Sequence, residues 1–339
     1  MTGQPIHDDH NKWQRRLDEL YRKRISDMKQ LDLTVENLHG LHEKLMRETI
    51  QIAIEKTESE QGKVPAHFTF FVMGSAGRAE QLQWSDQDHA IIYEQEDTAT
   101  KEENQSYFLK LGEEIVEALE SVGYERCDGN VMASNLKWCK SREDFKNQLL
   151  AWLREDTWEH MRYVLTFFDG RAILGPEHFL SELKETLFNE VSQNKQLLQR
   201  FKNNTGRMRN GIGLFGQLLT ETEGDHKGTF DLKQLALFPY VNGLRLLAIQ
   251  EEITAPETLK RFEELPDRCR DIQAYQASYR RLLEKRIVWQ STIQSYEKIH
   301  HVDVNKLDAN EKKQLKEWIK EGRELYHMVE KIVGSSHSL

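Results

Sequence analysis

The chain has 339 residues, with 56 acidic against 47 basic side chains and a formal net charge of −9. At about 150 residues per domain, this length provides for two ordinary hydrophobic cores. A diffuse acidic charge argues against nucleic acid as a partner, because phosphate backbones are bound by clustered lysines and arginines, and no apolar run reaches the ~18 residues that a membrane-spanning helix needs.

The beginning of the chain and its cysteines both bear on where the protein works. The polar first residues lack the basic and then apolar pattern of a secretory signal. The three cysteines, Cys127, Cys139 and Cys269, show no C-x-x-C spacing, so neither a disulfide framework nor a structural zinc site is indicated. We therefore expect a cytoplasmic protein with free thiols and no membrane partner.

Few helix breakers interrupt the chain, which contains only 19 glycines and 6 prolines. A mostly helical protein is expected from such a composition. Residues 13–56 carry apolar side chains at helical spacing, which predicts two or three amphipathic helices. A turn signal at residues 62–65 then precedes the aromatic and β-branched run of residues 67–73, which predicts a buried strand.

The middle of the chain mixes strand and helix signals. A second strand is predicted over residues 88–94, after a short polar turn and a helix. Residues 102–122 and 144–153 carry the spacing of helices, and residues 130–133 fit a short strand. Residues 163–168 fit either a strand or the end of a helix.

Strand signals almost disappear after about residue 176. Helical spacing covers most of the C-terminal half, over residues 180–219, 232–253, 257–299 and 310–333. The predicted fold class is α+β, with a small mixed sheet flanked by helices and followed by an all-helical domain. We expect N-terminal helices over residues 1–60, a catalytic α/β domain over 61–175 and a helical substrate domain over 176–339, with the last boundary in the turn of residues 170–175.

The most informative segment comes directly after the first predicted strand. The strand runs into Gly74-Ser75, where a residue without a Cβ lets backbone amides approach a ligand closely. The next residues, through Gln83, are predicted to begin a helix whose N-terminal amides favour an anion. The pattern suits phosphate binding, although its spacing is neither that of a P-loop nor that of a G-x-G-x-x-G dinucleotide fingerprint.

Two acidic residues, Asp86 and Asp88, stand at the start of the second predicted strand. Strand alternation puts both carboxylates on one face, where they repel each other unless they are protonated or bridged by a cation. Mg²⁺ suits such oxygen ligands together with substrate phosphates. Each feature alone also fits an ordinary turn or a solvated strand end, but together they favour phosphoryl or nucleotidyl transfer.

The same residues carry a resemblance to a known superfamily. Gly74-Ser75, Arg78, Glu80 and Asp86-Gln87-Asp88 resemble the G-S-x10-D-x-D signature of the polymerase-beta-like nucleotidyltransferases. The segment resembles more closely the bacterial nucleotidyltransferase-type proteins that are often fused to CBS domains and are related to the N-terminal domain of the protein-PII uridylyltransferase. His89 stands where asparagine is usual. Later blocks, including Cys127 and residues 129–135, extend the similarity over about residues 35–300, without a CBS domain.

This resemblance implies roles for individual residues. Asp86 and Asp88 are expected to hold Mg²⁺ or Mn²⁺, and Gly74 and Ser75 to position a nucleoside triphosphate. The superfamily usually has a third carboxylate that activates the acceptor. Asp169 is the first choice for this role, and Glu159 and Asp128 are the alternatives.

Four further residues have two interpretations each. Arg78 fits either a phosphate contact or an ion pair with Glu80 or Asp86. Asn130 fits either a nucleotide contact or a structural role in its turn. His226 and Lys227, in a polar loop, fit either contacts of the helical domain with substrate or a solvated connection between helices.

The predicted function is a metal-dependent nucleotidyltransferase that moves a nucleoside monophosphate from a nucleoside triphosphate to a protein or small-molecule acceptor, with release of pyrophosphate. Similarity to the uridylyltransferase suggests a role in signal transduction. One alternative is a nucleotide-sensing regulatory protein with little or no turnover, which acts through its helical domain. Another is a helical scaffold with an inactive site.

Overall fold

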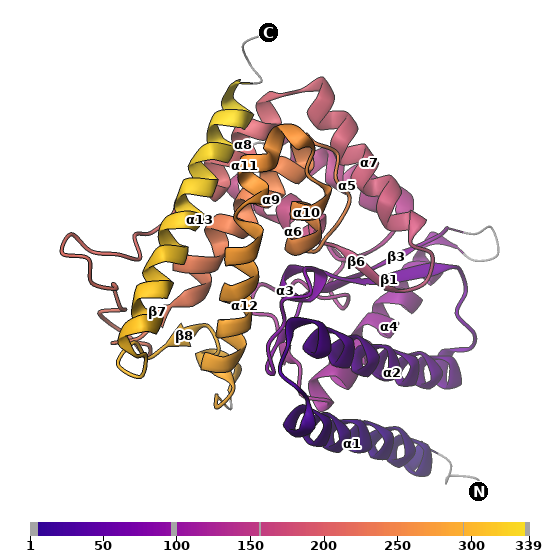
Figure 1. Cartoon of the computed structure of the whole chain (residues 1–339). Helices are drawn as coiled ribbons and strands as arrows, with labels where there is room; N and C mark the ends of the chain where they lie inside the picture. Colours follow the sequence, from indigo (N-terminus) through magenta and orange to yellow (C-terminus); the bar gives the residue numbers. More distant parts are fainter. Residues whose placement is uncertain (1–5, 96–99, 156, 294, 336–339) are drawn as a thin grey trace, which may run out of the picture. The chain divides into compact units, whose positions relative to one another are not determined.

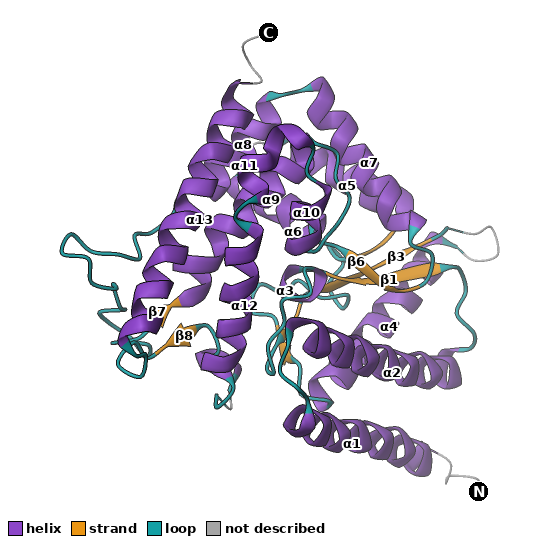
Figure 2. Ribbon diagram, viewed as in Figure 1, coloured by secondary structure: helices purple, strands orange, loops and turns teal. Residues whose placement is uncertain are grey.

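The structure is a computed structural model that describes residues 6–95, 100–155, 157–293 and 295–335 (Figure 1). Its elements divide into two compact units. Unit 1 comprises Met1–Gln148 and Gly170–Glu182, and unit 2 comprises Leu149–Asp169 and Leu183–Leu339. Helices dominate both units, and a small mixed sheet lies in unit 1 (Figure 2). The predicted α+β class is confirmed.

Two long helices open unit 1, α1 (Ile6–Gln30) and α2 (Val35–Gln61). The chain turns between them because Thr34 caps α2, its Oγ1 accepting a hydrogen bond from the Asn37 N–H at 3.2 Å. Apolar residues of α1, such as Trp13 and Leu17, belong to the same buried cluster as Ile50 of α2. The two or three helices predicted here are thus two.

The sheet of unit 1 has the strand order β5-β3-β1-β6. Its strands are β1 (Phe68–Val72), β3 (His89–Tyr93), β5 (Cys139–Ser141) and β6 (Arg171–Leu174). β1 is antiparallel to both β3 and β6, and β3 is parallel to β5. The predictions of β1 and β3 are confirmed. β6 occupies residues that were expected to form only a turn.

Helix α4 (Lys101–Ser121), predicted within one residue at each end, packs on this sheet. Its Phe108 stacks on Tyr93 of β3, with 4.3 Å between ring centroids. Helix α5 (Arg142–Arg154) also follows its prediction and continues from unit 1 into unit 2. The core that positions the site is therefore built from the sheet, α1, α2 and α4.

Two expectations near the site are wrong. The helix expected after Gly74-Ser75, through Gln83, is a single turn, α3 (Gly74–Gly77), because Ala79 takes a left-handed backbone conformation with φ of 57°. The strand expected over residues 130–133 is a turn, in which Asn130 has φ of 53° and its N–H bonds to the Cys127 carbonyl at 2.9 Å. Instead, a parallel pair of very short strands, β2 (Asp86–Gln87) and β4 (Glu125–Arg126), lies beside these turns.

Unit 2 is built almost entirely of helices. Helix α7 (His178–Gln193) begins in unit 1 and continues into unit 2. The other helices are α6 (Trp158–Phe168), α8 (Gln196–Thr205), α9 (Phe238–Gln250), α10 (Thr258–Glu264), α11 (Arg270–Gln273), α12 (Gln276–Gln290) and α13 (Ala309–Ser335), with a π-helical turn at Lys233–Leu237 and 3₁₀ turns at Asp267–Cys269 and Tyr296–Lys298. Residues 163–168 form the end of α6 rather than a strand. The helical structure predicted over residues 180–219 is formed by α7 and α8 and stops at Thr205, because four glycines interrupt residues 206–216. The described strands of unit 2 are β7 (Phe230–Asp231) and β8 (His301–Val302).

Close packing of α9 against α13 forms the centre of unit 2. The Tyr240 hydroxyl donates to the Trp318 carbonyl at 2.8 Å. A Cβ added at Gly243 would lie 2.6 Å from Cδ2 of Leu325, and one added at Gly322 would lie 2.6 Å from the Tyr240 ring. A larger residue at either position would therefore force Leu325 or Tyr240 to move. None of the helices in the described part of the chain combines the length and apolarity of a membrane span.

Candidate metal and nucleotide site

Asp86, Asp88 and Cys127 come together at the ends of three short segments of unit 1. Asp86 begins β2, Asp88 separates β2 from β3, and Cys127 follows β4. β2 and β4 are parallel, with Asp86 opposite Glu125 and Gln87 opposite Arg126. One further step along this register brings Cys127 opposite Asp88. The parallel pairing thus delivers a thiol to the aspartate pair that the sequence predicts.

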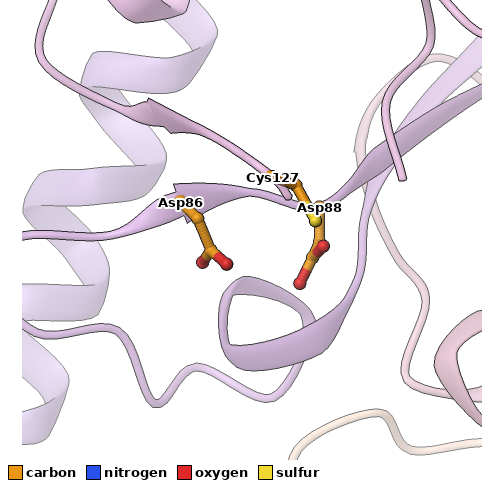
Figure 3. Close-up of side chains that lie close together, drawn as sticks. All are labelled: Asp86, Asp88 and Cys127. Carbon is orange, nitrogen blue, oxygen red and sulfur yellow. The ribbon is translucent and has the colours of Figure 1, made fainter. Parts of the chain in front are cut away.

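The three side chains form a group of metal-ligating atoms. One carboxylate oxygen from each aspartate and the Cys127 Sγ all lie within 4.8 Å of one another, and all three residues are partly exposed. Figure 3 shows the two carboxylates on the same side of the ribbon and the Cys127 sulfur beside Asp88. Two adjacent carboxylates favour a bound divalent cation, because it removes their mutual repulsion. The two carboxylates therefore suit a divalent cation, and the thiol adds a softer donor beside them.

Gly74 lies so close to Asp88 that a Cβ at this position would displace the carboxylate. Its φ is +54°, and a Cβ at this position would lie 2.2 Å from Oδ2 of Asp88 and 3.2 Å from its Cγ. The Met73 N–H also donates to the Asp88 carbonyl at 2.7 Å. The glycine turn after β1 is therefore packed directly against the aspartate, as expected for a turn that contributes to the same site.

Buried hydrogen bonds fix the aspartate-bearing strands from behind. Burial lowers the pKa of His89 to about 3, so the imidazole is neutral. Its Nδ1 accepts from the Ala133 N–H at 3.2 Å, and its Nε2 donates to the Gln87 side-chain oxygen at 3.0 Å. The Gln87 amide in turn donates to the Tyr124 carbonyl at 2.9 Å. His89 thus connects β2 to the turn after β4, and the usual asparagine is replaced by a structural residue.

The N-terminal helices hold the other side of this loop. Burial, with the nearby Arg24 charge, lowers the pKa of His42 to about 3. Neutral His42 in α2 accepts from the Tyr124 hydroxyl at 3.0 Å and donates to the Leu82 carbonyl at 2.8 Å. Arg24 in α1 donates to the carbonyls of Gln83 at 2.8 Å and of Val122 at 2.9 Å, and also to that of Gly123. Both residues position the segment that leads to Asp86.

The Cys127 thiol is protonated in this environment. Burial and the adjacent charges of Asp88 and Asp86 raise its pKa to about 12. The thiol also shares a hydrogen bond with Asp88. The other two cysteines, Cys139 and Cys269, are almost completely buried.

The remaining predicted residues of this region have distinct surroundings. Arg78 is buried, and its Nε donates to Glu80 Oε2 at 2.7 Å, which is the ion-pair alternative. Ser75 lies in α3 and is partly exposed. Asn130 is exposed in the turn that starts at Cys127. The structure therefore brings Gly74 and Ser75 into the turn beside the aspartates and engages Arg78 with a carboxylate.

The candidates for the third carboxylate have other contacts. Asp169 in unit 2 is fully buried, and its carboxylate accepts from Arg261 at 3.1 Å and from Arg245. The Glu159 carboxylate, in the same unit, accepts from the Tyr163 hydroxyl. Asp128 is exposed in the turn after Cys127. Two arginines on one buried carboxylate favour a structural role for Asp169, and its catalytic role stays a prediction.

His226 and Lys227 lie in the loop before β7, in unit 2. The His226 ring stacks on His301 of β8, with 3.7 Å between centroids and an angle of 4°. Lys227 is exposed, and its N–H bonds to the Gly224 carbonyl at 3.2 Å. The loop is therefore ordered by backbone bonds and ring stacking, with the lysine directed to solvent.

Cys127, His89, His42 and Arg24 were not predicted as site residues. The only sequence signal for Cys127 is its place in a later block of the family resemblance. Two-residue strands such as β2 and β4 carry no periodicity, so their pairing, and with it the thiol, is not visible from spacing.

Two family models match the chain. Residues 11–159 match the family model described as "Putative nucleotidyltransferase DUF294", and residues 195–333 match the model described as "Putative nucleotidyltransferase substrate binding domain". No curated protein matches the chain. The first match contains Gly74, Asp86, Asp88 and Cys127, and the second contains His226 and Lys227. The two models together cover most of the sequence, and the chain belongs to the nucleotidyltransferase family that they describe.

Proposed function

We propose that the protein transfers a nucleoside monophosphate from a nucleoside triphosphate to an acceptor, with release of pyrophosphate. The observation that carries this proposal is the pair of carboxylates from Asp86 and Asp88 packed against the Gly74 turn. In the proposed reaction, Asp86 and Asp88 hold Mg²⁺ or Mn²⁺. A bound cation of this kind neutralises triphosphate charge and orients the phosphate for in-line attack.

The residues around the pair have supporting roles in this proposal. Gly74 leaves room for the Asp88 carboxylate, and Ser75 in the same turn is proposed to contact the triphosphate. Asn130 is proposed to contact the nucleotide from the exposed turn after β4. Arg78, already paired with Glu80, is proposed to shape the turn and to reach phosphate only if that pair opens.

The acceptor is proposed to be a protein or a small molecule. A chain with a net charge of −9 is poorly suited to RNA or DNA. His226 and Lys227 lie in the segment matched by the substrate-binding model, and they are proposed to contact the acceptor or the nucleotide. Similarity to the uridylyltransferase supports a signalling role, in the cytoplasm.

Transfer is tested with α-phosphate-labelled nucleoside triphosphates, a cell extract as the source of acceptor, and Mg²⁺ or Mn²⁺. Asp86→Asn and Asp88→Asn should each abolish label transfer and leave the circular dichroism spectrum unchanged. Asp18→Asn, an exposed residue of α1, makes the same charge change elsewhere and should leave transfer intact. Turnover at the wild-type rate in an Asp86→Asn, Asp88→Asn double variant would refute the proposal.

A second function is favoured by the contacts of Asp169. Its carboxylate is bound by Arg245 and Arg261, and the third member of the described metal group is a thiol rather than an acid. A site without a carboxylate base would bind nucleotide and signal through the helical unit without turnover. Metal-dependent nucleotide binding in calorimetry, with no pyrophosphate released in the presence of extract, would establish this function instead.

A further inference from the structure

Cys127 gives the aspartate pair a chemical character that a site of oxygen ligands lacks. Its Sγ lies within 4.8 Å of a carboxylate oxygen of Asp86 and of one of Asp88. The parallel pairing of β2 with β4 fixes this neighbourhood through the backbone. The position is therefore not an accident of one flexible side chain.

The turn after β4 strengthens this placement. The Asn130 N–H closes it onto the Cys127 carbonyl at 2.9 Å. The next residue, Val131, accepts the His89 N–H through its carbonyl at 3.0 Å. Because His89 directly follows Asp88, the segment with the thiol and the segment with the aspartates are tied together on both sides of the site.

Ligand chemistry distinguishes the possible cations. Mg²⁺ prefers oxygen ligands and keeps most of its water. Sulfur ligands favour softer cations, and the thiol binds as a thiolate, so coordination releases its proton to solvent. We propose that Cys127 is a third ligand of the cation site formed by Asp86 and Asp88, and that it makes this site select thiophilic divalent cations, such as Zn²⁺, Co²⁺ or Cd²⁺, over Mg²⁺.

This inference rests on cation binding by Asp86 and Asp88, as in the proposed function, and adds the ligand that determines selectivity. It requires a thiol that a cation can reach. Cys127 is partly exposed, whereas Cys139 and Cys269 are buried, with exposed fractions of 0% and 2%. A sulfur-to-metal charge-transfer band is therefore expected to come from Cys127.

Titration of the full-length protein with Co²⁺ and Cd²⁺ tests the proposal by absorption. The wild type should show sulfur-to-metal charge-transfer bands that saturate at one equivalent of metal. Cys127→Ser should lose the bands and bind Cd²⁺ at least about tenfold more weakly, the lower limit seen when even an outer-shell partner is lost, and its Mg²⁺ affinity should fall less than its Cd²⁺ affinity. Cys269→Ala, the matched control, should keep the bands.

Separate variants distinguish this inference from the proposed function. Asp86→Asn should weaken the binding of all cations, including that of Mn²⁺, which is measured by electron paramagnetic resonance. Two results would show that the sulfur is not a ligand and would overturn only the further inference. The first is Mn²⁺ binding that depends on Asp86 with no charge-transfer band in the wild type. The second is a band that persists in Cys127→Ser. If Asp86→Asn leaves Mn²⁺ binding intact, the carboxylate site itself is refuted.

A measurement on the wild-type protein covers the case in which Cys127→Ser does not fold. Cd²⁺ should protect Cys127 from alkylation by iodoacetamide, as followed by peptide mass spectrometry, because a coordinated thiolate is no longer available. Mg²⁺ at saturation should not protect it. Equal alkylation of Cys127 with and without Cd²⁺ would overturn the proposal.

Discussion

Substitution of Gly74 by alanine separates the structural and functional demands on the turn after β1. Alanine at φ of +54° carries a backbone cost of about 1–2 kcal/mol. The added Cβ would also lie 2.2 Å from Oδ2 of Asp88. Because this atom is at the end of a side chain, the carboxylate can rotate away. The free energy of unfolding should therefore fall by little more than the backbone cost.

The same rotation of the Asp88 carboxylate should reduce the affinity of the site for a cation. A displaced carboxylate ligand is expected to weaken Mn²⁺ binding at least about tenfold, by comparison with the loss of outer-shell partners, or about 1.4 kcal/mol. Gly224→Ala is the matched control, because Gly224 has φ of +71° with nothing within 4 Å of an added Cβ. Mn²⁺ titration and urea denaturation measure the two effects. Wild-type Mn²⁺ affinity in Gly74→Ala would refute the reasoning.

Three further predictions concern the groups that support the two units. Acidification below about pH 6.5 should lower the free energy of unfolding by about 1.4 kcal/mol per pH unit for each of His42 and His89. Burial lowers their folded-state pKa values to about 3, so the unfolded chain binds more protons than the folded chain in this range. Urea denaturation between pH 5 and pH 7 measures the effect, and a free energy of unfolding that does not change with pH would contradict it. Arg24→Ala should destabilise the protein by at least about 1–3 kcal/mol by leaving buried carbonyls without a donor, whereas Arg22→Ala, exposed on the same helix, should have little effect in the same denaturation assay. Asp169→Asn should cost about 3–5 kcal/mol, because Arg245 and Arg261 lose their counter-charge; loss of transfer at unchanged stability would instead assign Asp169 to catalysis.

The strands that the sequence predicts are those with a strong local pattern. β1 and β3 are runs of aromatic and β-branched residues that are buried on both faces, so their composition alone identifies them. β5 and β6 have three and four residues with polar members. They exist because β3 and β1 offer free edges to them, which is a property of the tertiary structure.

In the candidate site, too, some residues are visible from a local sequence pattern and others only from the tertiary structure. Asp86 and Asp88 are found from their spacing and from the family resemblance. The sequence does not predict the early end of α3, because alanine has a high helix propensity. The left-handed conformation of Ala79 depends on the surrounding structure. Cys127 lies about forty residues from the aspartates along the chain, and only the β2–β4 pairing reveals their proximity.

The route of the chain between the units limits how the protein can be divided. β6 completes the sheet of unit 1, but residues 149–169 precede it and belong to unit 2. A fragment that stops at Gln148 would leave β1, which ends at the site, with an unpaired edge, and such edges invite aggregation. During synthesis, the sheet of unit 1 thus stays incomplete until α6, which belongs to unit 2, has been made. Because unit 1 and unit 2 alternate along the sequence, a single cut in the chain cannot release unit 1 with its sheet complete.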